Sequence, residues 1–237
     1  MGCSVAGSSH IKNNIPCEDY CGWKIYSDTV VMAVADGAGS ASLGSLGAKV
    51  AVEAALQTFS LMPSDAISGA HLKLAAYNSL QGVTRHAEAL CMEPSDLAST
   101  LILVAASPVR IVALQIGDGA SLFTSPGGSY ESCTTPPESE YANETTFLTS
   151  KNALETCQLV EKNTPVHQVA VITDGLQRIA LQMPQATPFV PFFQPILQFA
   201  KNSSDSGEDE LKRFLQSPRI TSRTDDDLTL LIVTMSS

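Results

Sequence analysis

The sequence predicts an α+β fold in which two layers of mainly antiparallel sheet are flanked by helices. Short apolar runs over about 99–125 are joined by turns that are too brief to hold a crossover helix, so neighbouring strands must run antiparallel. Two helical patterns, over about 46–59 and 64–92, precede these runs. Further helical segments follow over about 188–216, and a final apolar run at 228–234 returns the chain to the core.

The first half of the chain opens with a predicted hairpin. Strand patterns over Tyr20–Tyr26 and Thr29–Ala35 flank a short polar turn. The first helix that follows has its polar residues on one narrow stripe, which predicts that most of its surface is buried. The second helix has Ser64 and Asp65 as candidate N-caps, because their side-chain oxygens can accept hydrogen bonds from free backbone N–H groups.

Strand patterns dominate the middle of the chain. The predicted strands lie at about 99–107, 110–117, 120–125, 145–150, 156–162 and 167–173. Residues 127–144 are rich in Ser, Thr, Pro and Glu and predict a surface loop. Beyond Asp174 the pattern turns helical, and the polar stretch 202–210 is predicted to be a mobile surface loop.

Length and composition predict one globular domain that spans residues 1–237. Apolar residues make up 44% of the chain, enough for a large core, and the charged fraction of 16% is too low for a disordered protein. The formal net charge of -10 argues against binding to a nucleic-acid backbone, which needs clustered Lys and Arg, and against attraction to anionic membranes. We expect a monomer.

Cysteine usage and the N-terminal residues predict a cytoplasmic protein. The cysteines have neither a paired C-x-x-C motif nor a zinc-type spacing with histidine, so we expect reduced thiols. They are Cys3, Cys17, Cys21, Cys91, Cys133 and Cys157. The N-terminal segment lacks the apolar core of a secretion signal, and no segment has the length of a membrane span.

Aspartate recurs at the ends of the apolar runs. Three runs end in Asp-Gly, at Asp36, Asp118 and Asp174, and the triple aspartate 225–227 stands directly before the last strand. Asp-Gly is also a hairpin-turn signal, and for Asp118, with strands on both sides, a turn and a metal ligand are equally open. A loop or a helix follows the other two, which favours metal ligands there.

Carboxylates gathered at one edge of a sheet repel one another, and divalent cations offset that repulsion. Aspartate and glutamate oxygens suit hard ions such as Mg²⁺ or Mn²⁺, whereas the lack of a His or Cys ligand set argues against zinc. Two such ions a few ångströms apart would clamp the attacking and leaving oxygens of an in-line displacement at phosphorus. The acidic residues therefore favour the hydrolysis of phosphate esters.

The order of the motifs resembles that of the metal-dependent protein Ser/Thr phosphatases of type 2C, over nearly the whole chain. The motifs are CED at 17–19, VADGAGS at 34–40, STLILV at 99–104, IGDG at 116–119, ITDGL at 172–176 and DDDLTLLIV at 225–233. The opening GSSHIKNNIPCED, at 7–19, is most similar to a compact, bacterial-style branch. The resemblance implies a four-layer α-β-β-α sandwich with a dinuclear metal site at one end of the two sheets.

The resemblance also implies which residues hold the first metal ion. Asp36 resembles the catalytic carboxylate that bridges both ions, and Gly37 supplies a backbone carbonyl to one of them. Asp174 and Asp226 resemble the remaining carboxylate ligands of the first ion. Asp226 is preferred within the triple aspartate because it stands three residues before Thr229, as in the family's closing Asp-Asn-x-Thr motif.

Three further acidic residues complete the implied site. Glu18 resembles the residue of the second ion, often acting through water, with Asp19 beside it, and Asp118 resembles the ligand of a third, weaker ion. In this mechanism a water held between Mg²⁺ or Mn²⁺ ions loses its proton and attacks the phosphate, so that no protein nucleophile is needed.

The sequence departs from the family pattern at two positions. Many members have a phosphate-holding Arg four residues before the Glu, where this chain has Asn14, and a His after the Asp-Gly, where it has Ala38. His10 is then the candidate for facing the phosphate or donating a proton, and a structural His is the alternative. Arg178 or Arg223 could clamp the phosphate, although no motif supports either.

The leading hypothesis is a phosphatase that acts on phosphoserine or phosphothreonine in proteins. Its expected partners are phosphorylated proteins and a cognate Ser/Thr kinase. An alternative is a catalytically weak relative that binds metal or a phosphopeptide as a regulatory module, since the Arg and His positions are missing. A second alternative is a parallel, doubly wound domain like a response-regulator receiver. Antiparallel pairing between residues 99–106 and 110–117 would exclude it.

Overall fold

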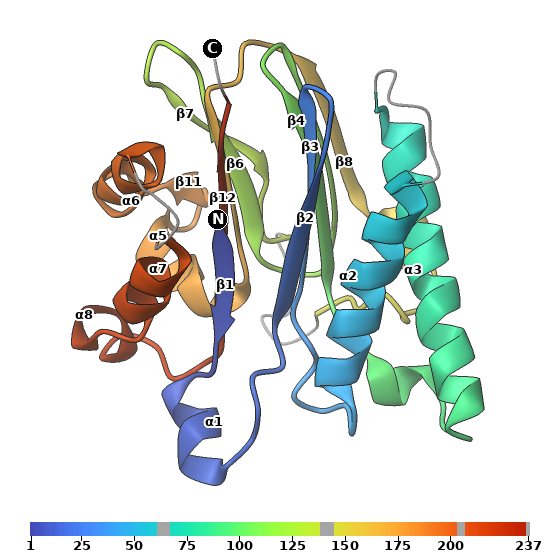
Figure 1. Cartoon of the computed structure of the whole chain (residues 1–237). Helices are drawn as coiled ribbons and strands as arrows, with labels where there is room; N and C mark the ends of the chain where they lie inside the picture. The colour runs from blue at the N-terminus through green and yellow to red at the C-terminus, as the bar shows by residue number, and fades with distance from the viewer. Residues whose placement is uncertain (61–66, 138–144, 203–206, 236–237) are drawn as a thin grey trace.

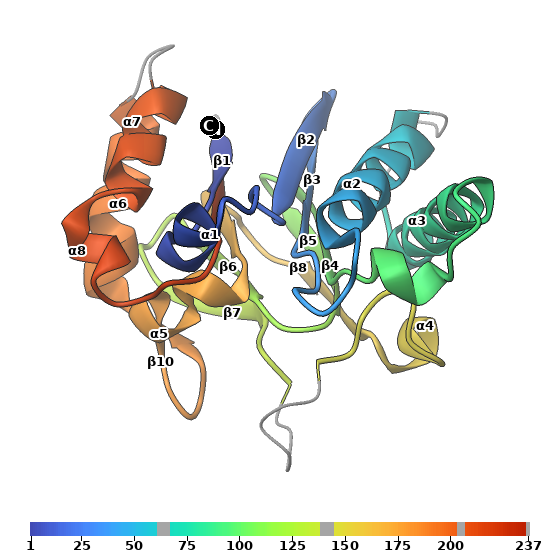
Figure 2. The ribbon, with the colours of Figure 1, turned by 90° about the horizontal axis from the view of Figure 1, so that it is seen from below.

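Two five-stranded antiparallel sheets stand face to face at the centre of the molecule (Figure 1). The computed structural model describes residues 1–60, 67–137, 145–202 and 207–235. Helices α2 and α3 cover one sheet, and the later helices α5 to α8 cover the other, as Figure 2 shows along the sheet ends. The predicted α+β sandwich of four layers, α-β-β-α, is therefore confirmed.

The first sheet has the strand order β1-β12-β9-β6-β7. Its strands are β1 (Gly2–Val5), β12 (Leu228–Thr234), β9 (Gln168–Ile172), β6 (Ala120–Thr124) and β7 (Tyr130–Thr134). The second sheet has the order β2-β3-β4-β5-β8. Its strands are β2 (Tyr20–Tyr26), β3 (Thr29–Ala35), β4 (Leu101–Ser107), β5 (Arg110–Ile116) and β8 (Gln158–Asn163). A separate two-stranded ribbon joins β10 (Leu181–Gln182) to β11 (Thr187–Pro188).

The central strands are buried on both faces, which explains their uninterrupted apolar sequences. In β3, Met32 and Val34 point toward the other sheet, whereas Ala33 and Ala35 point toward the helices. The layer between the sheets also contains Phe123, which is fully buried. Each residue step along β3 therefore alternates between two separate apolar layers.

Helices fill the outer layers. On the second sheet lie α2 (Gly44–Ser60) and α3 (Gly69–Ala89), with η1 (Pro94–Leu97) and α4 (Ala153–Thr156) beside them. On the first sheet lie η2 (Asp174–Leu176), α5 (Gln177–Ala180), α6 (Val190–Asn202), α7 (Gly207–Leu215) and α8 (Pro218–Thr221). None of the helices in the described ranges has the length and apolarity needed to cross a membrane.

One strand prediction and one loop prediction were wrong. Residues 145–150 contain no strand, and only residues 148–149 are in a turn. Phe147 donates its backbone N–H to Ser150 Oγ, and Leu148 donates its backbone N–H to the Ser99 carbonyl. Strand β7 lies inside the predicted loop 127–144, where Thr134 Oγ1 meets Ser121 Oγ of β6 at 2.7 Å. The rest of that predicted loop includes residues 138–144, which lie outside the described ranges.

Two helix boundaries also differ from the prediction. Helix α3 begins after Ser68, whose side chain and that of His71 form a capping box. The candidate caps Ser64 and Asp65 lie outside the described residues, as do residues 203–206 of the predicted loop at 202–210. The end of that predicted loop is instead helical, because α7 begins at Gly207.

The strand pairing excludes the doubly wound alternative. Strands β4 and β5 pair antiparallel, from Leu101 opposite Ile116 to Ser107 opposite Arg110. A short element pair that the sequence did not predict comes first in the chain: β1 and the helix α1 (Ser8–Asn13). Strand β1 pairs with β12, so segments more than 200 residues apart in the chain share one sheet edge.

Candidate metal centre

Three aspartates meet at one end of the two sheets. Asp36 directly follows β3 of the second sheet, Asp174 follows β9 of the first sheet by two residues, and Asp118 lies between β5 and β6. One carboxylate oxygen from each lies within 4.8 Å of the other two. Strands of both sheets thus deliver carboxylates to one point, as expected for a divalent-cation site built from oxygen ligands.

Asp118 does not turn a hairpin. Strand β5 belongs to the second sheet and β6 to the first, so the chain crosses between sheets at this position. Gly117 and Gly119 on either side have φ of 91° and 102°, a backbone conformation that favours glycine. Thr145 Oγ1 donates to Asp118 Oδ2 at 3.1 Å. The hairpin reading of this Asp-Gly is therefore wrong.

The backbone at Asp36 is fixed independently of its side chain. Asp36 donates its N–H to Thr100 Oγ1 at 2.9 Å, and its carbonyl accepts from the Thr100 N–H at 2.8 Å. Gly37 donates to the Glu18 carbonyl at 3.1 Å. A Cβ at Gly37 would collide with the backbones of Gly44 and Glu18, so only glycine fits. The Asp36 carboxylate is left free of these bonds.

Asp19 lies beneath the cluster, with an exposed fraction of 5%. Its Oδ2 accepts hydrogen bonds from Thr173 Oγ1 and Thr229 Oγ1, both at 2.8 Å. Its Oδ1 is buried without a donor among the described residues, and its carboxylate lies within hydrogen-bonding reach of that of Asp36. Two buried carboxylates this close need either a shared proton or a cation.

The pKa values of the clustered aspartates are raised, as expected for carboxylates that are buried close together. Burial raises the pKa of Asp36 well above its usual value, and the charges of Asp19 and Asp174 raise it further. Burial also raises the pKa of Asp174, to which Asp118 and Asp226 add by repulsion. For Asp19, burial raises the pKa and the two threonine hydroxyls oppose it. These residues fit a hard divalent cation, because a bound cation would restore the ionised state of an all-oxygen donor set.

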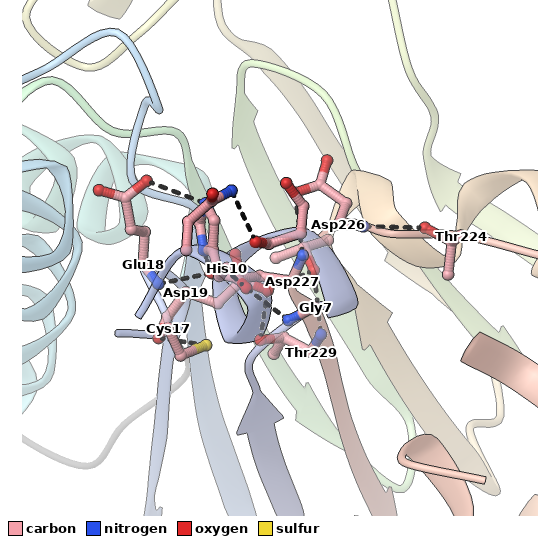
Figure 3. A network of polar contacts seen from close by, with 12 residues as sticks. Gly7, His10, Cys17, Glu18, Asp19, Thr224, Asp226, Asp227 and Thr229 are labelled. Carbon is pink, nitrogen blue, oxygen red and sulfur yellow. Dashed lines mark hydrogen bonds and ion pairs between the residues drawn. The ribbon is translucent and has the colours of Figure 1, made fainter. Parts of the chain in front are cut away.

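Asp227 links three segments beside the cluster (Figure 3). It is 3% exposed, and its two oxygens accept from the backbone N–H of Gly7 at 2.7 Å and of Glu18 at 2.6 Å. His10 Nδ1 lies 3.0 Å from the same carboxylate, and His10 Nε2 lies 3.8 Å from Glu18 Oε2. Asp227 therefore holds both His10 and Glu18 in place.

Asp226 has the opposite environment. Its side chain is exposed, its Oδ1 accepts the Asp227 N–H at 2.9 Å, and its charge raises the pKa of Asp36 and of Asp174. It stands outside the group of three oxygens within 4.8 Å, among the residues that the structure describes. Both oxygens of Asp227 accept hydrogen bonds from the protein, whereas Asp226 accepts only one, at Oδ1. Of these two aspartates, Asp226 is therefore the one with an oxygen available for a cation.

A known protein family matches most of this chain. A family model described as protein phosphatase 2C matches residues 6–216. The chain belongs to the protein phosphatase 2C family. The protein named serine/threonine-protein phosphatase 3 of Escherichia coli (strain K12) is 35% identical to this 2C-family chain over 241 residues, which cover 97% of this chain and 95% of the relative.

Solved structures share the phosphatase 2C fold. A bacterial serine phosphatase superposes with a TM-score of 0.71 and 13% identity, covering 100% of this chain and 97% of its own. The serine/threonine phosphatase Stp1 from Staphylococcus aureus gives a TM-score of 0.70 and 13% identity, covering 100% of this chain and 94% of its own. At this identity the likeness shows the fold of the 2C family and not the substrate.

The sequence alone did not reveal the residues that position the acidic cluster of this 2C phosphatase. Asp227 was grouped with its two neighbours, and Thr173 was not considered at all. A signal was present: Thr173 stands between β9 and Asp174, and Thr229 lies in β12, the strand paired with β9. Side-chain hydroxyls at such positions are suited to orient a buried carboxylate.

The departures from the 2C-family pattern have local explanations. Asn14 ends α1 with φ 55° and ψ 35°, a left-handed conformation that Asn adopts more readily than Arg. Arg223 lines a pocket among the helices of the first sheet, away from the three clustered oxygens. Among the described contacts, neither Arg178 nor Arg223 bonds to a cluster aspartate.

Proposed function

We propose that this protein hydrolyses phosphoserine and phosphothreonine esters in other proteins, and that Mg²⁺ or Mn²⁺ ions bound by the acidic cluster are required. The approach of Asp36, Asp118 and Asp174 to within 4.8 Å of one another carries the proposal. Membership of the 2C family and the name of the Escherichia coli relative support the substrate class.

The proposed ligand roles follow the placement of each oxygen. Asp36 would bind both ions as the central catalytic carboxylate, since Thr100 fixes its backbone and its carboxylate lies beside those of Asp19 and Asp174. Asp174 and Asp226 would hold the first ion together with the Gly37 carbonyl. Asp118 would hold a third, weaker ion.

Glu18 and Asp19 serve the second ion in different ways. Burial raises the pKa of Glu18, while His10 lowers it. Its carboxylate lies at the edge of the cluster beside His10, which suits a ligand that acts through water. Asp19 is oriented from behind by Thr173 and Thr229. We propose that its unsatisfied Oδ1 faces the cations.

Bound divalent ions would lower the pKa of a coordinated water and neutralise charge on the phosphate. The chain's own part is to position the carboxylates and to protonate the leaving group. His10 is proposed for the second task, because its Nδ1 is engaged by Asp227 and its Nε2 remains on the side of Glu18. A seryl leaving group is a strong base, so proton donation at this step lowers the barrier.

Residues 1–237 are proposed to form one catalytic domain that acts as a monomer in the cytoplasm. Pairing of β1 with β12 supports the single domain, because it ties distant parts of the chain into one sheet. The six free cysteines suit a reducing compartment. Phosphoproteins are the proposed partners, and a Ser/Thr kinase that phosphorylates the same substrates is a further candidate.

A metal titration tests the proposal. Metal-free protein is titrated with Mn²⁺ or Mg²⁺ while phosphate release from a phosphothreonine peptide is measured, with Asp36→Asn as the control. We expect saturable activation of the unmodified chain and almost none of the variant. Metal binding by calorimetry without turnover above the Asp36→Asn level would contradict the proposal and favour a regulatory module.

A further inference from the structure

A second hollow lies among the helices that cover the first sheet, separate from the acidic cluster. It has a volume of about 610 Å³ and is lined by residues of α5, α6, α7 and α8. Figure 2 shows these helices on the outer side of the first sheet. Small-molecule sites in proteins commonly have volumes of about 300–1,000 Å³ and mostly apolar walls. Neither the metal ions nor the phosphoryl group of the proposed reaction requires this hollow.

Aromatic side chains form much of its wall. Phe192 is buried and packs edge-to-face on Phe193 at 5.0 Å between ring centroids, and it contacts Phe214 at 6.4 Å. Phe189, Phe199 and Phe214 line the hollow and are only partly buried. Their remaining exposed surface is apolar area that water covers unfavourably and that a ligand would bury.

Two arginines stand at the same hollow. Arg219 and Arg223 line it from α8 and the turn that follows, and both are exposed. Neither has an ion-pair or hydrogen-bond partner for its guanidinium group among the described contacts. The chain carries only 14 Lys and Arg residues against 24 Asp and Glu residues. Glu210 of α7 also lines the hollow, so its charged lining consists of two arginines and one acid. The excess of one positive charge complements a ligand with a single negative charge.

We propose that this hollow binds a small amphipathic anion, with an aliphatic or aromatic body among the phenylalanines and a carboxylate or similar anionic group on Arg219 and Arg223. The apolar walls would provide most of the affinity, and the two guanidinium groups would orient the head group. Arg223 precedes Asp226 by three residues, so the anion would lie against the segment that leads into the acidic cluster.

Decanoate is the probe that tests this inference. Its binding to the full chain is measured by calorimetry on metal-free protein dialysed free of chelator, so that the result does not depend on phosphatase activity. We expect one saturable site at decanoate concentrations below about 1 mM. Absence of saturable binding up to that concentration would overturn the inference.

Two double variants distinguish binding at the hollow from nonspecific attraction of decanoate to positive charge. R219Q/R223Q should weaken decanoate binding by about tenfold or more, because two charge-assisted contacts are lost. The matched control K73Q/R85Q removes two exposed charges from α3 on the other sheet and should change the affinity by less than about twofold, since screening limits distant charges. Equal weakening in both pairs would overturn the inference.

The apolar part is tested independently. Phe199→Ala should weaken binding of decanoate and of uncharged 1-decanol alike, whereas R219Q/R223Q should weaken decanoate alone. Phe199 is partly exposed, so the variant is expected to fold, which circular dichroism checks. Unchanged decanoate affinity in Phe199→Ala would exclude the cavity as the binding site.

Discussion

His10 and Asp227 are bonded to each other, with His10 Nδ1 3.0 Å from the Asp227 carboxylate. The same carboxylate accepts the backbone N–H groups of Gly7 and Glu18. One buried side chain thus joins the beginning of α1, the segment before β2 and the beginning of β12. The position of the proposed proton donor depends on a residue that we do not assign to any metal ion.

Asp227→Asn should destabilise the protein. Both oxygens of Asp227 accept backbone N–H groups, so the amide NH₂ of Asn must face at least one donor and leave it unsatisfied. A buried unsatisfied group costs about 1–3 kcal/mol. Urea unfolding of the metal-free protein measures this, with exposed Asp225→Asn as the control expected to stay within about 0.5 kcal/mol. Equal stability of the two variants would show that the network contributes nothing.

Asp36→Asn and Asp174→Asn should each lower turnover by about 100-fold or more, because each removes a proposed ligand of a two-metal site. Asp226→Asn should lower metal affinity clearly more than Asp225→Asn. Manganese titration of phosphatase activity for the four variants gives both quantities. Comparable losses at Asp225 and Asp226 would contradict the choice of Asp226.

The metal-free protein should lose stability as the pH rises. Burial raises the pKa of Asp36, so the folded state keeps a proton that the unfolded chain releases above about pH 4. Between that pH and the higher folded pKa, one such proton lowers the free energy of unfolding by up to about 1.4 kcal/mol per pH unit. Above the folded pKa the full cost remains.

Asp36→Asn should remove part of this dependence and be more stable than the unmodified protein at pH 7.5 without metal. Urea unfolding at pH 5.5 and 7.5 compares them. Saturating Mn²⁺ should reverse the order at pH 7.5, since only the carboxylate binds the cation strongly. A metal-free variant less stable than the unmodified protein at pH 7.5 would show that the cluster is not under electrostatic strain.

His10→Gln should affect phosphopeptides more than p-nitrophenyl phosphate. General acid catalysis contributes about 10²–10⁴-fold when the leaving group is a strong base, and little when it is a stable phenolate. The ratio of kcat/KM values for the two substrates is the informative quantity. An equal loss for both would show that His10 only positions Glu18.

Gly175→Ala should destabilise the protein by about 1–3 kcal/mol, as does the insertion of a methyl group into a filled space. A Cβ at Gly175 would collide with the carbonyl oxygen of Asp227, so the triple-aspartate segment would have to move. Gly127→Ala is the matched control, because its nearest neighbour, Ser125 Oγ, would lie 3.7 Å from the added Cβ. Thermal unfolding with and without Mn²⁺ measures the effect on both stability and metal binding.

The sandwich was predictable because its central strands are buried on both faces. Strand β3 is buried at every position, and a short, uninterrupted apolar run between polar turns is typical of such a central strand. Helix α1 was missed because none of its residues is buried, so it leaves no apolar periodicity. Residues 145–150 look like a strand by composition, yet of this segment only Leu148 is buried.

The sequence predicted that Asp36, Asp118 and Asp174 lie together, but not which neighbouring carboxylates are buried and which are exposed. Asp36 and Asp174 come together because each follows the end of a central strand, and this depends on the backbone arrangement and not on the neighbouring side chains. Asp226 and Asp227 are adjacent and chemically identical, and only the fold distinguishes them, by burying one against three donors and exposing the other. The crossing between sheets at Asp118 likewise depends on strand partners that are distant in sequence.

The antiparallel pairing of β1 with β12 also determines when the first sheet can be completed during protein synthesis. Val5 lies opposite Leu228, so the sheet edge beside the cluster cannot close while the ribosome is still adding the intervening residues. Contacts of such large sequence separation form late and slowly. A nascent chain that ends before β12 therefore lacks Asp226, Asp227 and the anchor of His10. This end of the sheet can be completed only after β12 has been synthesised.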